Sequence, residues 1–160
     1  MKKMNIDKII VLDFGSQYNQ LIVRNIRELG VYSELKPFNT EIKELQDASI
    51  KGIILSGGPH SVYDLDSFSA STEIFNLGIP VLGICYGMQW ISQVFGGKIE
   101  AANMKEYGKQ EIVIFKSSPL LANLPKKQIV WMSHGDYVRE LPDGFTCLAS
   151  SQNTNNAIMA

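Results

Sequence analysis

The sequence has little cysteine, little net charge and no long apolar run. Its two cysteines, Cys85 and Cys147, give no disulfide framework, which is typical of a protein from a reducing, cytoplasmic compartment. Fifteen Lys and Arg residues against 16 Asp and Glu residues give a formal charge of -1, so no basic excess is available to hold a phosphate backbone. No apolar stretch approaches the roughly 20 residues that span a bilayer. We therefore expect neither a nucleic-acid nor a membrane partner.

Targeting and linker signals are equally sparse. The sequence begins with MKKMNIDK, like a signal peptide, but the apolar stretch that follows covers only residues 9–12 and ends at Asp13, so it is too short for a signal core. No linker divides the 160 residues, of which 45% are hydrophobic. We expect a cytoplasmic protein in which residues 1–160 form one compact domain.

Apolar runs and helical patterns alternate along the first part of the chain. Short apolar runs predict strands at residues 9–12, 31–36, 52–55 and 81–84, and helical spacing predicts helices at residues 16–29, 40–46, 70–77 and 88–95. This β-α-β-α order predicts an α/β fold of three layers (αβα), with a flavodoxin-like, mostly parallel sheet covered on both faces.

The pattern changes after Gly97. Strand-like runs at residues 112–115, 129–132 and 145–149 are separated by turns, with little helix between them. We therefore expect a mixed or antiparallel C-terminal extension. The charged segment 97–108 leaves two interpretations open, a solvated face or a docking surface.

One cysteine lies in an unusual pentapeptide, Gly83-Ile84-Cys85-Tyr86-Gly87. Its spacing is that of a nucleophile elbow, in which the reactive side chain sits on a tight strand-to-helix turn. A side chain at either flanking glycine would collide with the neighbouring strand or helix. The N-terminus of the following helix favours a thiolate, and the N–H of Tyr86 is placed to donate to an oxyanion. A buried structural cysteine is the alternative, but the position between an apolar run and an amphipathic helix favours catalysis.

A second loop supports this interpretation. Gly57 and Gly58 follow another predicted strand, and their N–H groups are candidates to complete an oxyanion hole. An ordinary strand-to-helix turn is the alternative at this position. Cys147 shows none of these features, and we expect it to be a core residue.

Four stretches occur in an order that carries a resemblance. They are DFGSQY (13–18), LSGGP (55–59), GICYGMQ (83–89) and WMSHGD (131–136). Together they resemble the class I (triad-type) glutamine amidotransferases, and the resemblance runs from about residue 8 to residue 160. The middle two stretches are shared across that family, whereas the first and last are particular to one branch.

The resemblance implies a covalent reaction and assigns the site. In the family a cysteine attacks the side-chain amide of glutamine, a γ-glutamyl thioester forms, ammonia leaves and water releases glutamate. Cys85 matches the nucleophile, while Gly58 and Tyr86 match the oxyanion-hole donors through their N–H groups.

The glutamine-binding positions are carried over in the same way. Gln89, one helical turn after the nucleophile, matches a residue that contacts the substrate. Ser133, Gly135 and Asp136 fall in a loop that holds the amino-acid end of glutamine. From spacing alone these three residues equally fit a polar turn, and His134 belongs to this stretch rather than to the position of a catalytic base.

The sequence departs from the family at the base. The family uses a histidine with a glutamate two residues later, whereas His60 and His134 are the only histidines and neither has that glutamate. We expect the domain to be C-terminally incomplete and inactive alone, because the base assists both thiolate formation and ammonia departure. The branch implies a partner, an ATP-pyrophosphatase-type synthetase domain or subunit that binds ATP and Mg and aminates xanthosine monophosphate. We expect no cofactor in the present domain.

Other interpretations remain open. Residues 56–61 superficially resemble the phosphate loop of ATP pyrophosphatases, but His60 replaces the acidic residue of that loop. Another cysteine hydrolase of the same architecture usually has His directly after its cysteine, where Tyr86 stands here. A non-catalytic module that binds glutamine or docks a synthetase is the third alternative. A metal site is not expected, because no Cys-x-x-Cys or His-x-x-x-His pair occurs.

Overall fold

The computed structural model describes residues 6–160, apart from the side chains of residues 103–105. The chain divides into two compact units, the first ending at Trp90 and the second beginning at Ile91. No helix in the described residues is both long and apolar enough to cross a membrane.

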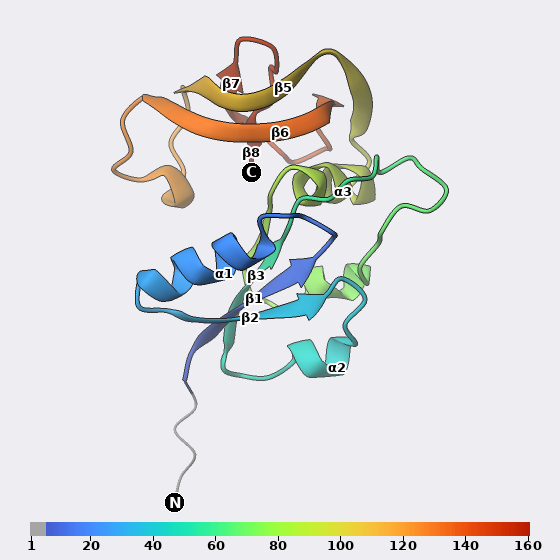
Figure 1. Ribbon diagram of the computed structural model, residues 1–160, viewed down its shortest axis with the longest axis vertical. Coiled ribbons are helices and arrows are strands. Elements are labelled where there is room, and N and C mark those ends of the chain that lie inside the picture. The colour runs from blue at the N-terminus through green and yellow to red at the C-terminus, as the bar shows by residue number, and fades with distance from the viewer. Residues whose placement is uncertain (1–5) are drawn as a thin grey trace, which may run out of the picture. The chain divides into compact units, whose positions relative to one another are not determined.

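The first unit is a parallel sheet with helical connections (Figure 1). Its elements are β1 Lys8–Asp13, α1 Asn19–Glu28, β2 Tyr32–Pro37, α2 Ile42–Leu45, β3 Ile50–Leu55, the 3₁₀ helix η1 Thr72–Asn76, β4 Val81–Gly83 and the start of α3 Tyr86–Val94. The strand order is β2-β1-β3-β4, and every pairing is parallel. This is the predicted flavodoxin-like arrangement, and the α/β fold class is confirmed.

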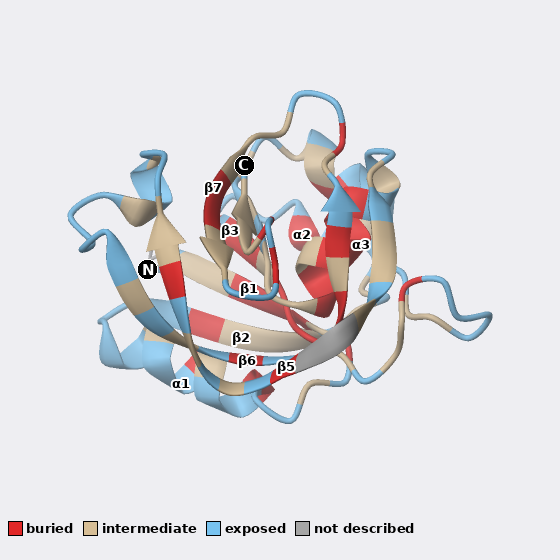
Figure 2. Cartoon of the chain, turned by 90° about the horizontal axis from the view of Figure 1, so that it is seen from above, coloured by how far each residue is buried: buried red, intermediate tan, exposed pale blue. Residues whose placement is uncertain are grey.

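The two central strands explain why the apolar runs are continuous rather than alternating. Ile10, Val11 and Leu12 of β1 have no exposed surface, and Ile53 and Leu55 of β3 are also buried (Figure 2). A strand covered on both faces needs apolar side chains at successive positions. The carboxyl ends of β1, β3 and β4 therefore lie at one edge of a rigid sheet.

The helix expected at residues 70–77 is only the single 3₁₀ segment η1. The Ser71 side chain accepts a hydrogen bond from the N–H of Glu73 and begins the segment. Gly78 has a φ of +70° and lies just after the end of the segment.

The second unit is an antiparallel sheet, which confirms the expected change of architecture. It contains β5 Lys98–Ile114, the 3₁₀ helix η2 Pro119–Leu121, β6 Lys127–Glu140, β7 Cys147–Ser151 and β8 Ile158–Met159, with the strand order β6-β5-β7-β8. Ile112, Met132 and Ala149 form its buried cluster. Residues 98–108 of the charged segment belong to β5, and the choice between a solvated face and a docking surface stays a prediction.

Candidate active site

Cys85 lies between the end of β4 and the start of α3, in a left-handed backbone conformation with a φ of +48°. Among the described non-glycine residues only Asn123 shares a positive φ. Side chains rarely adopt this conformation, so the surrounding turn must enforce it. We call residues 83–87 the elbow.

The two flanking glycines are required by close backbone packing. A Cβ atom on Gly83 would lie 2.5 Å from the carbonyl carbon of Gly87 at the start of α3. A Cβ atom on Gly87 would lie 2.4 Å from the carbonyl oxygen of Leu55 in β3. Any side chain at either position would displace backbone, which is the predicted reason for the Gly-x-Cys-x-Gly spacing.

Backbone hydrogen bonds hold the elbow against β3. The N–H of Ile84 donates to the carbonyl of Leu55 at 2.9 Å, and the N–H of Gly87 donates to the carbonyl of Ser56 at 3.1 Å. The N–H of Gln89 donates to the carbonyl of Cys85 at 3.0 Å and begins the helical ladder of α3. The cysteine is thus fixed at a helix N-terminus, where partial positive charge favours a thiolate.

The loop after β3 lies beside the elbow, as predicted. A Cβ atom on Gly57 would lie 3.6 Å from the Cβ of Cys85. A Cβ atom on Gly58 would lie 2.4 Å from the carbonyl oxygen of Phe14, so the chain passes there too closely for any side chain. Within the described part of the chain, the N–H groups of Gly58 and Tyr86 donate to no other protein atom. Both donors are available to an anionic oxygen near Cys85.

Ser56 joins these loops, although no pattern in the sequence assigned it a role. Its side chain is fully buried, its Oγ accepts from the N–H of Phe14 at 2.9 Å, and it donates to the carbonyl of Gly57 at 2.9 Å. One hydroxyl therefore fixes the chain leaving β1 to the chain leaving β3. A small polar residue directly after a fully apolar strand is the signal that could have revealed it.

The side chain of Tyr86 anchors the start of α3. Its hydroxyl donates to the carbonyl of Phe68 at 2.6 Å, and its ring packs against that of Phe14 with 5.5 Å between centroids. Burial of the hydroxyl raises the pKa of Tyr86. The buried ring fixes the position of the backbone N–H, which is the group with a predicted role.

Cys147 has very different surroundings. Its thiol donates to the carbonyls of Ala149 at 3.3 Å and Asn155 at 3.1 Å. Burial raises the pKa of this thiol, which disfavours the reactive thiolate. Cys147 is half-buried rather than part of the buried core, so the expected core position was only partly right.

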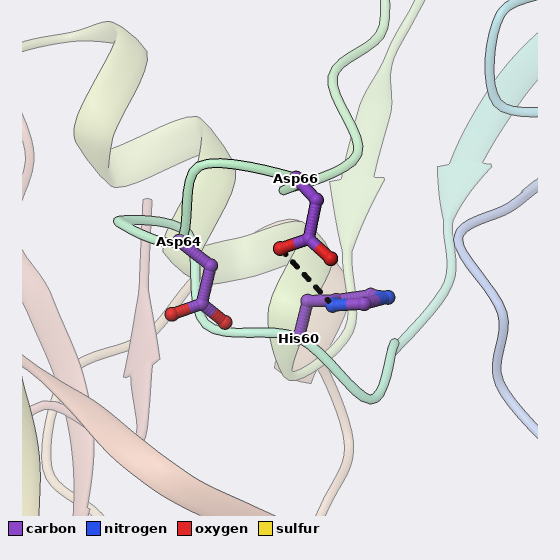
Figure 3. Close-up of side chains that lie close together, drawn as sticks. All are labelled: His60, Asp64 and Asp66. Atoms are coloured by element: carbon purple, nitrogen blue, oxygen red, sulfur yellow. Dashed lines mark ion pairs between the residues drawn. The ribbon is translucent and has the colours of Figure 1, made fainter.

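Three possible metal ligands lie together on the loop after Gly58 (Figure 3). The ligating atoms of His60, Asp64 and Asp66 all lie within 4.8 Å of one another. His60 Nδ1 is 4.0 Å from Asp66 Oδ1, and Asp64 Oδ2 accepts from the N–H of Ser61 at 2.8 Å. These contacts within the loop account for the cluster without a metal. Spacings of paired cysteines and histidines do not indicate this cluster, because two of its members are aspartates.

The predicted substrate residues fall in both units. Gln89 is buried in α3 of the first unit, close in sequence to the elbow. Ser133, Gly135 and Asp136 belong to the second unit. They lie within β6 rather than in a loop or turn, so the expected local structure was wrong. A long strand was not foreseen because this stretch is polar, although β5 supplies it with a pairing partner.

Comparison with known proteins identifies the family. Residues 10–160 match the family model described as glutamine amidotransferase class-I, and the chain belongs to this family.

Its relatives include GMP synthases. The chain is 56% identical over all 160 residues to the GMP synthase [glutamine-hydrolyzing] of Bacillus subtilis, and 59% identical over 149 residues, 93% of the chain, to that of Staphylococcus aureus. It spans 31% and 29% of the lengths of these relatives. A proposed GMP synthase subunit of Thermoplasma acidophilum superposes with a TM-score of 0.78 at 30% identity, covering 97% of this chain and 82% of that one.

Proposed function

We propose that this chain is the glutamine amidotransferase domain of a GMP synthase, with residues 1–160 acting as one domain. The observation that carries the proposal is the elbow, where Cys85 has a left-handed backbone beside two N–H groups that donate to no other protein atom among the described residues. The similarity to GMP synthases over the whole chain supports glutamine hydrolysis as the reaction that this cysteine serves.

In the proposed reaction the Cys85 thiolate attacks the amide carbon of the glutamine side chain. The N–H groups of Gly58 and Tyr86 stabilise the negative charge that develops on the amide oxygen. The carbon–nitrogen bond then breaks, the nitrogen takes a proton and leaves as ammonia, and a γ-glutamyl thioester remains on Cys85. Water hydrolyses the thioester, which releases glutamate and restores the thiol.

Four residues are proposed to bind glutamine. Gln89 follows the nucleophile by one turn of α3, and Ser133, Gly135 and Asp136 lie together on β6. An amino acid needs both an acceptor for its ammonium group and donors for its carboxylate. Asp136 offers the acceptor, while the Ser133 hydroxyl and the backbone of Gly135 offer donors.

The ammonia is proposed to pass to a synthetase of the ATP-pyrophosphatase type, which uses ATP and Mg to aminate xanthosine monophosphate. Neither histidine of this chain matches the base of the family, and we propose that the 160 residues alone hydrolyse glutamine negligibly. No cofactor is proposed for this domain, and the cytoplasm is its proposed location.

The test compares this chain with a chimera in which it replaces the matching segment of the Bacillus subtilis enzyme. We expect the chimera to release glutamate from glutamine at a rate at least about a thousandfold above the isolated chain, the scale expected when a catalytic base is restored. A chimera whose folded domain fails to turn over glutamine would contradict the proposed activity. Equal turnover by both proteins would contradict only the need for an additional base.

A second candidate function is a non-catalytic module that binds glutamine or docks a synthetase. It is favoured by the unmatched histidine and glutamate of the family. Exposure to an electrophilic glutamine analogue, followed by mass spectrometry, separates the two functions. Labelling confined to Cys85 supports a glutamine site with a reactive thiolate, whereas labelling of Cys147 counts against such a site.

A further inference from the structure

The second unit contains a glutamate that is almost completely buried. Glu106 of β5 is 1% exposed. Its carboxylate accepts hydrogen bonds from the hydroxyls of Ser151 at 2.5 Å and Thr154 at 2.7 Å. The third polar neighbour is His134 of β6, whose Nε2 lies 3.5 Å from Oε2 of the carboxylate. A buried carboxylate needs such partners, and these come from two segments of the unit, β6 and the turn of residues 151–154.

This contact lies at a break in the sheet. Glu106 pairs with His134 across β5 and β6, Ala101 pairs with Asp136, and the register shifts between these two pairs. Five steps along β5 correspond to two steps along β6. A register shift disrupts the regular ladder locally, so side-chain contacts such as those of Glu106 contribute to the position of β6.

The His134 ring has two different nitrogen environments. Nε2 faces the carboxylate, whereas Nδ1 is buried and has no hydrogen-bond partner among the described residues. A carboxylate only accepts hydrogen bonds, so the ring nitrogen that faces it is the one placed to carry a proton, which favours the Nε2–H tautomer over the Nδ1–H tautomer.

We propose that Glu106 is a positioning residue that acts through His134. It holds the imidazole as the Nε2–H tautomer and fixes residues 133–136 of β6 at the break in the ladder. The claim about the tautomer concerns the second unit alone. The claim about residues 133–136 rests on the proposed function, because β6 carries Ser133 and Asp136 and Glu106 would then influence the affinity for glutamine.

The first test measures the imidazole directly. Long-range ¹H–¹⁵N NMR on the 160-residue chain should show two histidine rings, and His60→Asn assigns the remaining one to His134. We expect the Nε2–H pattern for His134, a mixture of tautomers in Glu106→Gln, and no change in Glu111→Gln, which is the same substitution at an exposed position of β5. An Nδ1–H pattern in the unsubstituted chain would overturn the proposal whether or not the variants fold, and an unchanged pattern in a folded Glu106→Gln would also overturn it.

The second test uses glutamine kinetics in the Bacillus subtilis chimera. Glu106→Gln should raise KM for glutamine about tenfold and leave kcat within about twofold, because the substitution affects binding rather than the reacting atoms. Glu111→Gln, the matched control at an exposed position of β5, should change KM by less than about threefold. A fall in kcat at constant KM, or no change in either constant, would overturn the positioning role. If the unsubstituted chimera does not hydrolyse glutamine, the proposed function fails, and the NMR measurement still decides whether Glu106 fixes His134.

Discussion

The elbow and residues 133–136 of β6 are held in place by different means. In the elbow the backbone itself is the constraint, because Gly83 and Gly87 approach other backbone atoms too closely for a Cβ. In β6 the ladder is irregular, and the buried Glu106 holds the neighbouring segments through side chains. The difference teaches that substitutions in the elbow should damage folding or chemistry, whereas substitutions around Glu106 should mainly change affinity.

The largest expected change in glutaminase turnover comes from substituting Cys85. A comparison with Cys147 tests whether the elbow is the reactive region. Cys85→Ala in the chimera should lower glutaminase turnover by at least about three powers of ten, because it removes the nucleophile. Cys147→Ala should stay within about threefold of the unsubstituted chimera, because its thiol contacts only carbonyl groups. Comparable losses in both variants, measured as glutamate release, would remove the functional distinction between the regions.

The next largest effect is expected on stability, when the close backbone packing at the two elbow glycines is disturbed. Gly83→Ala and Gly87→Ala should each lower the free energy of unfolding by about 2–4 kcal/mol, since the new Cβ displaces backbone atoms. Gly52→Ala is the control, because its Cβ would meet the end of the Ile9 side chain at 3.2 Å and would stay 3.6 Å from the carbonyl oxygen of Pro80. Urea denaturation of the chain measures all three variants. Equal stability of the elbow variants and the control would show that the elbow relaxes at little cost.

This contrast also explains what the sequence could predict. The parallel strands and the elbow were predictable because buried strands need continuous apolar runs and a crowded turn needs glycine. Both signals can be read from residues that are close in sequence, although the contact that requires Gly87 comes from Leu55 of β3.

The second unit was less predictable for the opposite reason. Glu106 contacts Thr154 and His134, which are 48 and 28 positions away, and no local pattern indicates such a network. The polar stretch at residues 133–136 looked like a turn because its strand character comes from pairing with β5. The role of Ser56 was missed for a similar reason, since its acceptor and donor partners include Phe14, 42 positions away.

A smaller effect tests whether side chains also matter near the elbow. Ser56→Ala should lower the free energy of unfolding by about 1–3 kcal/mol, because the buried N–H of Phe14 loses its acceptor. Ser117→Ala, at an exposed position, should change it by less than about 0.5 kcal/mol. If Ser56→Ala matches this control in urea denaturation, the loops after β1 and β3 are held by backbone packing alone.

The smallest change in stability is expected for Tyr86→Phe, which distinguishes the role of the Tyr86 side chain from that of its backbone N–H. Tyr86→Phe removes the hydroxyl that donates to the carbonyl of Phe68, so it should lower the free energy of unfolding by about 1 kcal/mol. The substitution keeps the ring, its packing against Phe14 and the backbone N–H, and glutaminase turnover of the chimera should stay within about twofold. A loss of turnover much larger than the loss of stability would mean that the phenol takes part in the reaction. Retained turnover would support a role confined to the backbone, the same kind of constraint that the two glycines of the elbow impose.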